Sequence, residues 1–172
     1  MGDLTRFEAV VLPHLDAAYT LARYLTRDPH DAEDVVQDAC LRAMQHFGGF
    51  AGEGPTSARA WLLAIVRNVA YTSRRRRRAD SATEFDEAVH SEAAADENPE
   101  RALLRQTAKE SLTDALDRLA PEFREVIVLR ELQGLSYKEI SDVTGVPVGT
   151  VMSRLSRARE RLLQALRAEE RG

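Results

Sequence analysis

The chain contains 172 residues, of which 44% are hydrophobic and 30% are charged, and it carries a formal net charge of −4. This length and balance predict a folded globular protein with one medium domain or two small ones. No apolar run approaches the ~18 residues that a membrane span needs, and the N-terminus lacks the basic-then-apolar pattern of a signal peptide. We therefore expect a cytoplasmic protein. Because Val and Ile recur at helical spacing, the fold is predicted to be all-α.

The negative charge is concentrated in one internal segment. Residues 1–78 carry 11 arginines and 9 acidic residues, and residues 101–172 carry 13 basic and 11 acidic residues. Residues 79–100 carry 8 acidic residues and neither lysine nor arginine. A segment of this kind, poor in large apolar residues, is typical of a linker. We expect two small helical domains, 1–78 and 101–172, joined by an acidic flexible linker whose role beyond spacing stays open.

The first strongly patterned helix is predicted to begin at Asp28, which is followed by Pro29. Apolar residues then recur at three-to-four spacing as far as Phe47. The outward face combines acidic, amide and basic side chains with one apolar residue: Asp34, Gln37, Asp38, Leu41, Arg42 and Gln45. A mixed face suits a protein partner, and an ordinary solvated face is equally compatible with it.

A glycine-rich stretch, GGFAGEGP at 48–55, cannot continue that helix and is predicted to be a flexible loop able to hold a ligand. Ser57 can cap a second long helix. Its outward positions include Arg59, Arg67, Asn68 and Tyr71. The helix ends in five consecutive arginines, Arg74–Arg78. Five adjacent arginines surround a helix and cannot all pair internally, which favours a polyanionic partner over a solvated helix end.

The segment LSYKEISDVTGVPVGTVMSRLSRARER predicts a helix-turn-helix. Ser136 and Glu139 have the spacing of a capping box at the start of its first helix. Gly145 can end that helix in the left-handed conformation, and Pro147 prevents its continuation. A second helix must then begin near Val148.

The two faces of this second helix differ in chemistry. At about 100° per residue, Val151, Leu155 and Ala158 fall on one apolar stripe. The opposite face carries small polar side chains and arginines, which suit close approach to a major groove and contacts with phosphates and guanine edges. Helical bundles that do not bind DNA also contain such helix pairs, but their exposed faces usually mix Glu and Lys. The composition therefore favours DNA binding.

Three blocks of the sequence together resemble a known family. They are DAEDVVQDACLRAMQHF, ARAWLLAIVRNVAYTSRRRRR and LAPEFREVIVLRELQGLSYKEISDVTGVPVGTVMSRLSRARERL. In this order and spacing they resemble an extracytoplasmic-function (ECF) sigma factor of the bacterial sigma-70 family, over essentially the whole chain. The resemblance implies a dissociable subunit of bacterial RNA polymerase. One helical domain would recognise and melt the −10 promoter element, and the other would recognise the −35 element.

The resemblance also implies roles for individual residues. The expected contacts with the clamp helices of the polymerase's largest subunit are Asp34, Gln37, Asp38 and Leu41. The expected contacts with −10 DNA are Phe50, Ser57, Arg59, Arg67, Asn68, Arg74 and Arg75. The expected contacts with −35 DNA are Thr150, Met152, Ser153, Arg154, Ser156 and Arg157. The implied partners are core polymerase, including its flap region, promoter DNA and an anti-sigma factor.

Two departures limit what the resemblance transfers. Thr72 stands where many family members have an acidic residue, and Met152 stands where a basic residue is frequent. The base preferences at −10 and −35 therefore do not carry over. The loop at 48–57 matches the family element that captures a flipped base, a task that needs a mobile loop able to surround the base.

Two other protein classes compete with this interpretation. A stand-alone helix-turn-helix regulator would explain residues 101–172 but would leave residues 1–78 without a role. A helical metalloenzyme is suggested by the E-x-x-H pair Glu87 and His90, but a di-metal bundle needs two such motifs. We therefore predict a sigma factor without a catalytic, cofactor or metal site, with the stand-alone regulator as the alternative.

Overall fold

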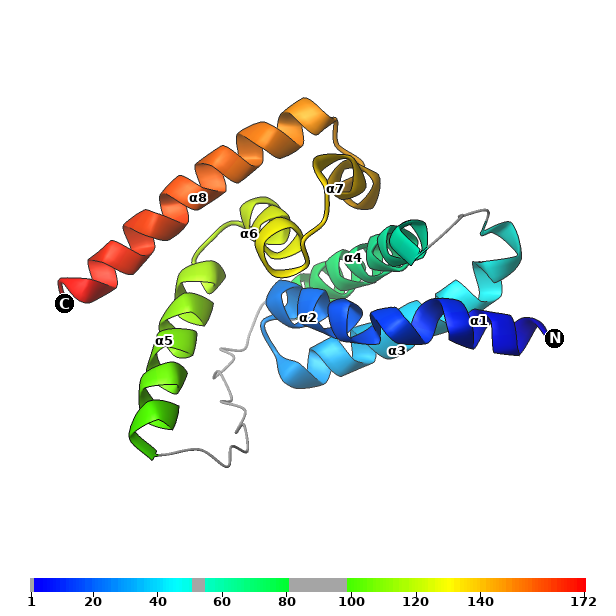
Figure 1. The fold of residues 1–172 in the computed structure, drawn as a ribbon, viewed down its shortest axis with the longest axis horizontal. Coiled ribbons are helices and arrows are strands. Elements are labelled where there is room, and N and C mark those ends of the chain that lie inside the picture. The colour runs from blue at the N-terminus through cyan, green and yellow to red at the C-terminus, as the bar shows by residue number, and fades with distance from the viewer. Residues whose placement is uncertain (1, 51–54, 81–98) are drawn as a thin grey trace.

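The structure is a computed structural model in which residues 2–50, 55–80 and 99–172 are described. Within these ranges the chain forms helices joined by short turns and no strand, which confirms the all-α prediction (Figure 1). The N-terminal helices are α1 (Asp3–Val11), α2 (Leu15–Thr26), α3 (Pro29–His46) and α4 (Pro55–Asp80). The C-terminal helices are α5 (Pro99–Asp117), α6 (Pro121–Ile127), α7 (Tyr137–Thr144) and α8 (Val148–Glu170). Residues 81–98 of the predicted linker at 79–100, which include the Glu87 and His90 pair, lie outside the described residues, as do residues 51–54 of the glycine-rich loop.

Helices α2, α3 and α4 form an N-terminal bundle, and α1 packs along α4. Residues at the helix ends fix where the chain turns from α2 into α3. Arg27 takes a left-handed conformation, with φ of 64°, and ends α2, while the Asp28 carboxylate accepts a hydrogen bond of 3.0 Å from the Asp31 N–H and caps α3. The bundle core consists of small and branched apolar residues with no exposure: Ala18, Leu21, Ala22, Ala32, Ala39, Ala43, Leu62, Leu63 and Val66. The many alanines let the helices approach closely.

The C-terminal unit contains the predicted helix-turn-helix. The Glu139 N–H donates to the Ser136 hydroxyl at 3.1 Å, and the Ser136 N–H donates to the Glu139 carboxylate at 3.0 Å, so the capping box is confirmed. Gly145 ends α7 with φ of 77°, and α8 begins at Val148, as the sequence predicts. The apolar stripe of α8 is buried against α6.

The side chain of Arg124, on α6, is 1% exposed and has no carboxylate partner within hydrogen-bond distance among the described residues. Its guanidinium donates instead to four carbonyl oxygens, which belong to Leu116, Asp117, Leu119 and Tyr24. Three of these acceptors lie at the C-terminal end of α5, where the helix macrodipole favours a cation. Burial lowers the pKa of Arg124 to about 10, and the charge of Arg27 adds to this effect.

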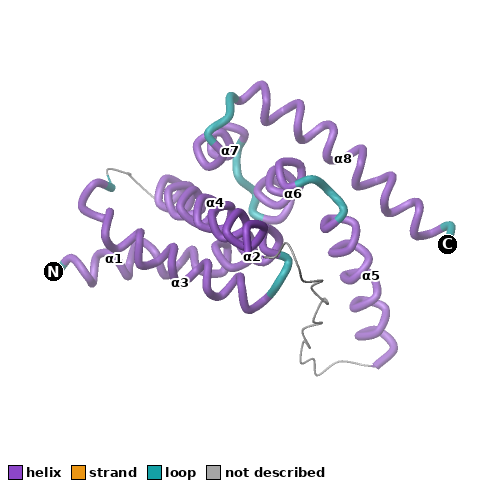
Figure 2. The backbone as a smooth tube through the Cα atoms, turned by 180° about the vertical axis from the view of Figure 1, so that it is seen from behind, coloured by secondary structure: helices purple, strands orange, loops and turns teal. Residues whose placement is uncertain are grey.

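The two units lie side by side, as Figures 1 and 2 both show. Helix α4 packs against α7, and α2 packs against α6. Helix α4 runs two residues past the predicted boundary at 78, and α5 begins at Pro99 rather than at residue 101. No helix in the described ranges is long and apolar enough to span a membrane. Because the units touch, any surface that faces from one to the other is closed to outside partners in this arrangement.

Candidate polymerase and nucleic-acid interfaces

The outward face of α8 matches the sequence prediction. Met152, Ser153, Ser156 and Arg157 are exposed, while Thr150 and Arg154 are half-buried. The α7–Gly145–α8 turn leads into α8, which lies along the outer edge of the molecule (Figure 1). An exposed row of short polar side chains next to an arginine has the shape and chemistry that major-groove recognition needs.

Two of the four arginines in the N-terminal two-thirds of α8 are already engaged within the protein, and the fifth arginine of the helix, Arg167, lies in its last turn. Arg159 donates to Glu131 at 2.9 Å, and the guanidinium of Arg161 lies 4.5 Å from the centre of the Phe123 ring. In contrast, Arg154 and Arg157 form no ion pair with any part of the chain that the structure describes. The two arginines that the family resemblance assigns to −35 DNA are therefore unpaired, whereas the next two along the helix are not.

The predicted polymerase-docking residues share one side of α3. Asp34 and Gln37 are exposed, and Leu41 is 60% exposed. Asp38 pairs with Arg42 at 3.4 Å, one turn further along the helix. An apolar side chain that stays exposed among charged groups is a feature of protein interfaces rather than of a purely solvated face.

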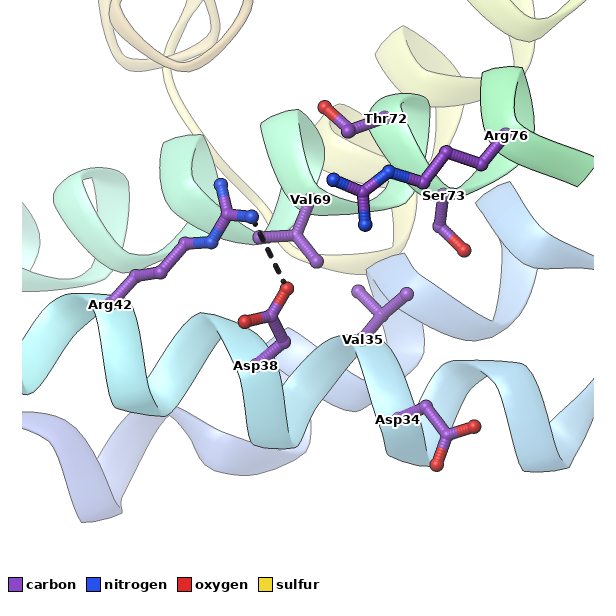
Figure 3. Close-up of a pocket in the computed structure, with 8 residues that line it drawn as sticks. All are labelled: Asp34, Val35, Asp38, Arg42, Val69, Thr72, Ser73 and Arg76. Carbon is purple, nitrogen blue, oxygen red and sulfur yellow. Dashed lines mark ion pairs between the residues drawn. The ribbon is translucent and has the colours of Figure 1, made fainter.

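A shallow pocket separates this face of α3 from α4 (Figure 3). Val35 and Val69 form its apolar part, and polar groups from both helices surround them: Asp34, Asp38, Arg42, Thr72, Ser73 and Arg76. The pocket joins the predicted docking face to the arginine-rich end of α4. The sequence placed Arg42 on the mixed face of α3 and Arg76 in the arginine run of α4, but only the packing of α3 on α4 brings the two to one pocket.

The predicted −10 residues on α4 fall on two different stripes. At about 100° per residue, Arg59, Arg67 and Arg74 share one side of the helix, whereas Asn68 and Arg75 share a second side about 100° around the helix from Arg67 and Arg74. Asn68 and Arg75 are exposed. The first three are half-buried, which differs from the outward orientation expected for Arg59 and Arg67. These two arginines point out of the N-terminal bundle but meet the C-terminal unit instead of solvent.

Arg67 forms the strongest contact between the units. Its Nε and Nη2 donate to the two carboxylate oxygens of Glu125 at 2.6 and 3.1 Å, and Glu125 is fully buried. The guanidinium also lies 4.5 Å from the centre of the Tyr71 ring. Burial lowers the pKa of Arg67, but the hydrogen bond and charge of Glu125 outweigh it and leave that pKa above its usual value. Burial, followed by the charge of Glu125, raises the pKa of the Tyr71 hydroxyl.

Arg59 contacts the C-terminal unit less completely. One terminal nitrogen donates to the Gln133 carbonyl oxygen at 3.1 Å, and the other lies 3.6 Å from the Glu139 carboxylate. Arg74 lies on the same stripe about four turns further along α4, and burial together with the charge of Arg78 lowers its pKa. Sequence reasoning missed both carboxylates that face this stripe. For Glu125, the sequence feature that could have indicated a buried carboxylate is the charged pair Arg124–Glu125 inside the otherwise apolar run FREVIVL.

Phe50 belongs to an aromatic cluster at the base of the glycine-rich loop. Its ring centre lies 4.7 Å from that of Trp61 and 6.1 Å from that of Phe47. The ring of Phe7 meets Phe47 edge-on, with centres 5.4 Å apart. The cluster anchors the start of the loop against α1 and α4. The Ser57 side chain and the loop tip at 51–54 lie outside the described residues.

Comparison with known proteins decides the family. Residues 10–80 match Sigma-70 region 2, and residues 109–162 match Sigma-70, region 4. The chain is 36% identical over 174 residues to the RNA polymerase sigma-H factor of Pseudomonas aeruginosa, covering 96% of this chain and 88% of that protein. The chain belongs to the ECF sigma factors of the sigma-70 family. It is an RNA polymerase sigma factor, a transcription initiation factor that binds core polymerase and directs it to promoters.

Other relatives support the same family. The chain is 35% identical to ECF RNA polymerase sigma factor SigE of Mycolicibacterium smegmatis, covering 91% of this chain and 60% of that protein. The sigma factor RpoE of Bartonella quintana, solved with the anti-sigma factor NepR, superposes with a TM-score of 0.77 at 32% identity, covering 94% of this chain and 97% of that one. CnrH, solved with the cytosolic domain of CnrY, gives a TM-score of 0.68 at 29% identity, covering 97% and 91%. The sequence prediction of an ECF sigma factor is confirmed. A stand-alone regulator is disfavoured, because residues 10–80 match a sigma region of their own.

Proposed function

We propose that this sigma factor uses three separate surfaces in transcription initiation. The outer face of α8 contacts the −35 element, α4 contacts the −10 element, and the outward side of α3 docks on core polymerase. The observation that carries this proposal is the pairing pattern on α8. Arg154 and Arg157 carry no ion pair among the described residues, whereas Arg159 and Arg161 are engaged within the protein.

The −35 contact follows from the exposed side chains of α8. Ser153, Ser156 and Arg157 face outward near the N-terminal end of the helix, where a recognition helix meets base edges. Thr150, Met152 and Arg154 flank them. Met152 can offer only an apolar contact, so this chain is expected to differ in base preference from relatives with a basic residue there.

The −10 contact is assigned to both stripes of α4. Asn68 and Arg75 are available directly, and Arg59, Arg67 and Arg74 become available when the C-terminal unit moves away. Phe50, on its aromatic cluster, and Ser57 flank the loop that would receive a flipped base. Arginines along one helix suit a single strand, because they neutralise its phosphates and stack on its bases.

Docking on core polymerase is assigned to Asp34, Gln37, Asp38 and Leu41. The clamp helices of the largest subunit are the expected partner for these residues, and the flap region is expected to contact the C-terminal unit. The polymerase supplies the nucleotidyl transfer, and this chain contributes no catalytic group. It acts in the cytoplasm, where polymerase and chromosome meet.

An anti-sigma factor completes the expected set of partners. Two similar solved structures are complexes, RpoE with the anti-sigma factor NepR and CnrH with the cytosolic domain of CnrY, and each match covers more than nine tenths of this chain. By analogy, we propose that such a protein binds this chain and withholds it from polymerase until a signal releases it.

Transcription with purified components tests the proposal. Core polymerase alone and core polymerase with this chain are supplied with genomic DNA, and the 5′ ends of the transcripts are sequenced. The proposal predicts a set of start sites that requires the chain and shares upstream elements at −10 and −35. Transcripts that do not change when the chain is added would contradict it.

A further inference from the structure

An exposed apolar ridge runs along the first turns of α8. It consists of Val148, which is 40% exposed, and Met152, which is 52% exposed. The two lie four residues apart, so their side chains are neighbours on one side of the helix. The ridge borders the buried stripe, in which Val151 and Leu155 are 0% and 1% exposed. It therefore lies in the part of α8 that carries the proposed −35 contacts.

Met152 borders the face that we propose for DNA. At about 100° per residue, Gly149 and Ser153 occupy the middle of that face, with Met152 on one flank and Arg157 on the other. A Cβ added at Gly149 would meet nothing within 4 Å, and the short Ser153 side chain is exposed. The helix backbone can therefore approach a groove closely here, and the two flanking side chains would reach opposite sides of the groove.

Met152 lies away from the strong hydrogen-bond donors of α8. Arg154 and Arg157, which carry no ion pair among the described residues, lie about 160° and 140° around the helix from it. The Ser153 hydroxyl donates to the Thr150 carbonyl oxygen at 3.1 Å, so its hydrogen is used within the helix. The thioether of methionine donates no hydrogen bond and accepts one only weakly. Met152 can therefore recognise a base only by apolar contact.

One group on the base edges of the major groove matches this chemistry. The edges of the base pairs present hydrogen-bond donors and acceptors, and the C5 methyl group of thymine is their only apolar feature. 5-Methylcytosine carries the same methyl group on the same ring carbon. Methionine is unbranched and polarizable, so it adapts to a small apolar group. A phosphate would gain nothing from such a side chain, whereas covering a methyl group removes apolar surface from water.

We propose that Met152 determines specificity at the −35 element by covering the C5 methyl group of a pyrimidine in the major groove. The inference rests on the proposed assignment of the α8 face to −35 DNA. Val148 extends the apolar surface by one turn. The chain then favours thymine or 5-methylcytosine over cytosine at one position of the element. Burial of one methyl group corresponds to about a fourfold gain in affinity.

Changing that methyl group in the DNA tests the proposal without altering the protein. Promoter duplexes are built from a start site found by the transcript sequencing above. Each thymine of the −35 element is replaced in turn by deoxyuridine, which lacks only the methyl group, and each cytosine by 5-methylcytosine. Competition filter binding by core polymerase with this chain measures each affinity. At one position the methyl group should change the affinity about fourfold. An effect at a thymine identifies thymine as the source, and an effect at a cytosine identifies 5-methylcytosine.

Protein variants assign the effect to Met152. Met152→Gln keeps the length of the side chain but replaces its apolar end with an amide, so the methyl-dependent difference should disappear. Met152→Leu keeps an apolar side chain and should retain most of the difference. Leu163→Gln is the matched control, because Leu163 is also 52% exposed and lies on the same side of α8 about three turns further along, beyond the proposed contacts. It should leave the difference unchanged.

Two results would overturn the inference. Equal affinity for all methylated and unmethylated duplexes would show that no methyl group is recognised. A fourfold difference that survives in Met152→Gln would assign the recognition to another residue. If Arg157→Ala and changes of the −35 sequence still weaken binding in either case, only the inference about Met152 fails. If neither affects binding, the proposed −35 role of α8 fails as well.

Discussion

The buried guanidinium of Arg124 donates a hydrogen bond of 3.1 Å to the Tyr24 carbonyl oxygen, 100 residues earlier in the chain. The same side chain also donates hydrogen bonds to three carbonyl oxygens at the C-terminal end of α5 and so caps that helix. It therefore stabilises the fold of the C-terminal unit and also ties that unit to α2.

Replacing Arg124 with Met should be strongly destabilising. The substitution keeps much of the volume but leaves buried carbonyl oxygens without donors, so the free energy of unfolding should fall by about 3 to 5 kcal/mol. Urea denaturation followed by circular dichroism measures this change. Arg118→Met, at an exposed position close by on the chain, should cost far less. Equal losses for the two variants would show that the carbonyl contacts do not matter.

Replacing Arg157 with Ala should weaken promoter binding by core polymerase with this chain by about 1 to 3 kcal/mol, if the side chain holds a base edge. If it touches only phosphate, the loss should be similar across sequences and the salt dependence should become shallower by about one unit of slope. Arg159→Ala is the control, since Arg159 is paired with Glu131. Filter binding over a range of salt concentrations separates these cases. A larger loss of promoter affinity for Arg159→Ala than for Arg157→Ala would contradict the prediction that Arg157, and not Arg159, contacts DNA.

Combining Asp38→Arg with Leu41→Arg should abolish binding to core polymerase and leave helicity intact. Mismatched charge buried at an interface costs several kcal/mol, whereas both side chains are on the surface of the free chain. Co-purification with core polymerase gives the readout. The control is Asp16→Arg, which reverses the charge at an exposed position on a different helix, α2, and should still bind. Undiminished co-purification of the double variant would mean that this side of α3 does not dock.

Cys40 is the only cysteine of the chain, so its reactivity reports on the N-terminal bundle alone. Burial raises the pKa of its thiol above the usual value, and only the thiolate reacts with alkylating reagents. The native chain should therefore react slowly, with a pH profile whose midpoint lies above that of the same chain in urea. Iodoacetamide labelling followed by mass spectrometry measures both profiles. Identical profiles in the two conditions would show that the thiol is not protected.

The helix-turn-helix was predictable because its signals are local. Ser136 and Glu139 are three residues apart, Gly145 acts on its own turn, and the stripe containing Val151 repeats within one helix. Each of these depends on neighbours in sequence, and the structure confirms them. The exposed mixed face of α3 was predicted in the same way, from a single helical period, and its docking on core polymerase stays a prediction.

The closed interface could not be predicted from sequence. Arg67 and Glu125 are 58 residues apart, and each is of a type that is usually solvated. The position of Glu125 in an apolar run indicates that it is buried, but it does not indicate which residue pairs with it. Closure also turned two predicted DNA-binding arginines inward, since a helical period shows which residues share a face and not what covers that face.

Footprinting on a duplex promoter, with and without core polymerase, tests the central claim that this chain recognises promoters as a polymerase subunit. The free chain presents one small recognition helix, and the arginines that we propose for −10 DNA on one side of α4 are half-buried, so it should protect the duplex poorly on its own. With core polymerase, protection should extend over both the −35 and −10 elements and depend on the −35 sequence. Occupation of a palindromic duplex site by the chain alone, at nanomolar concentration, would contradict the claim.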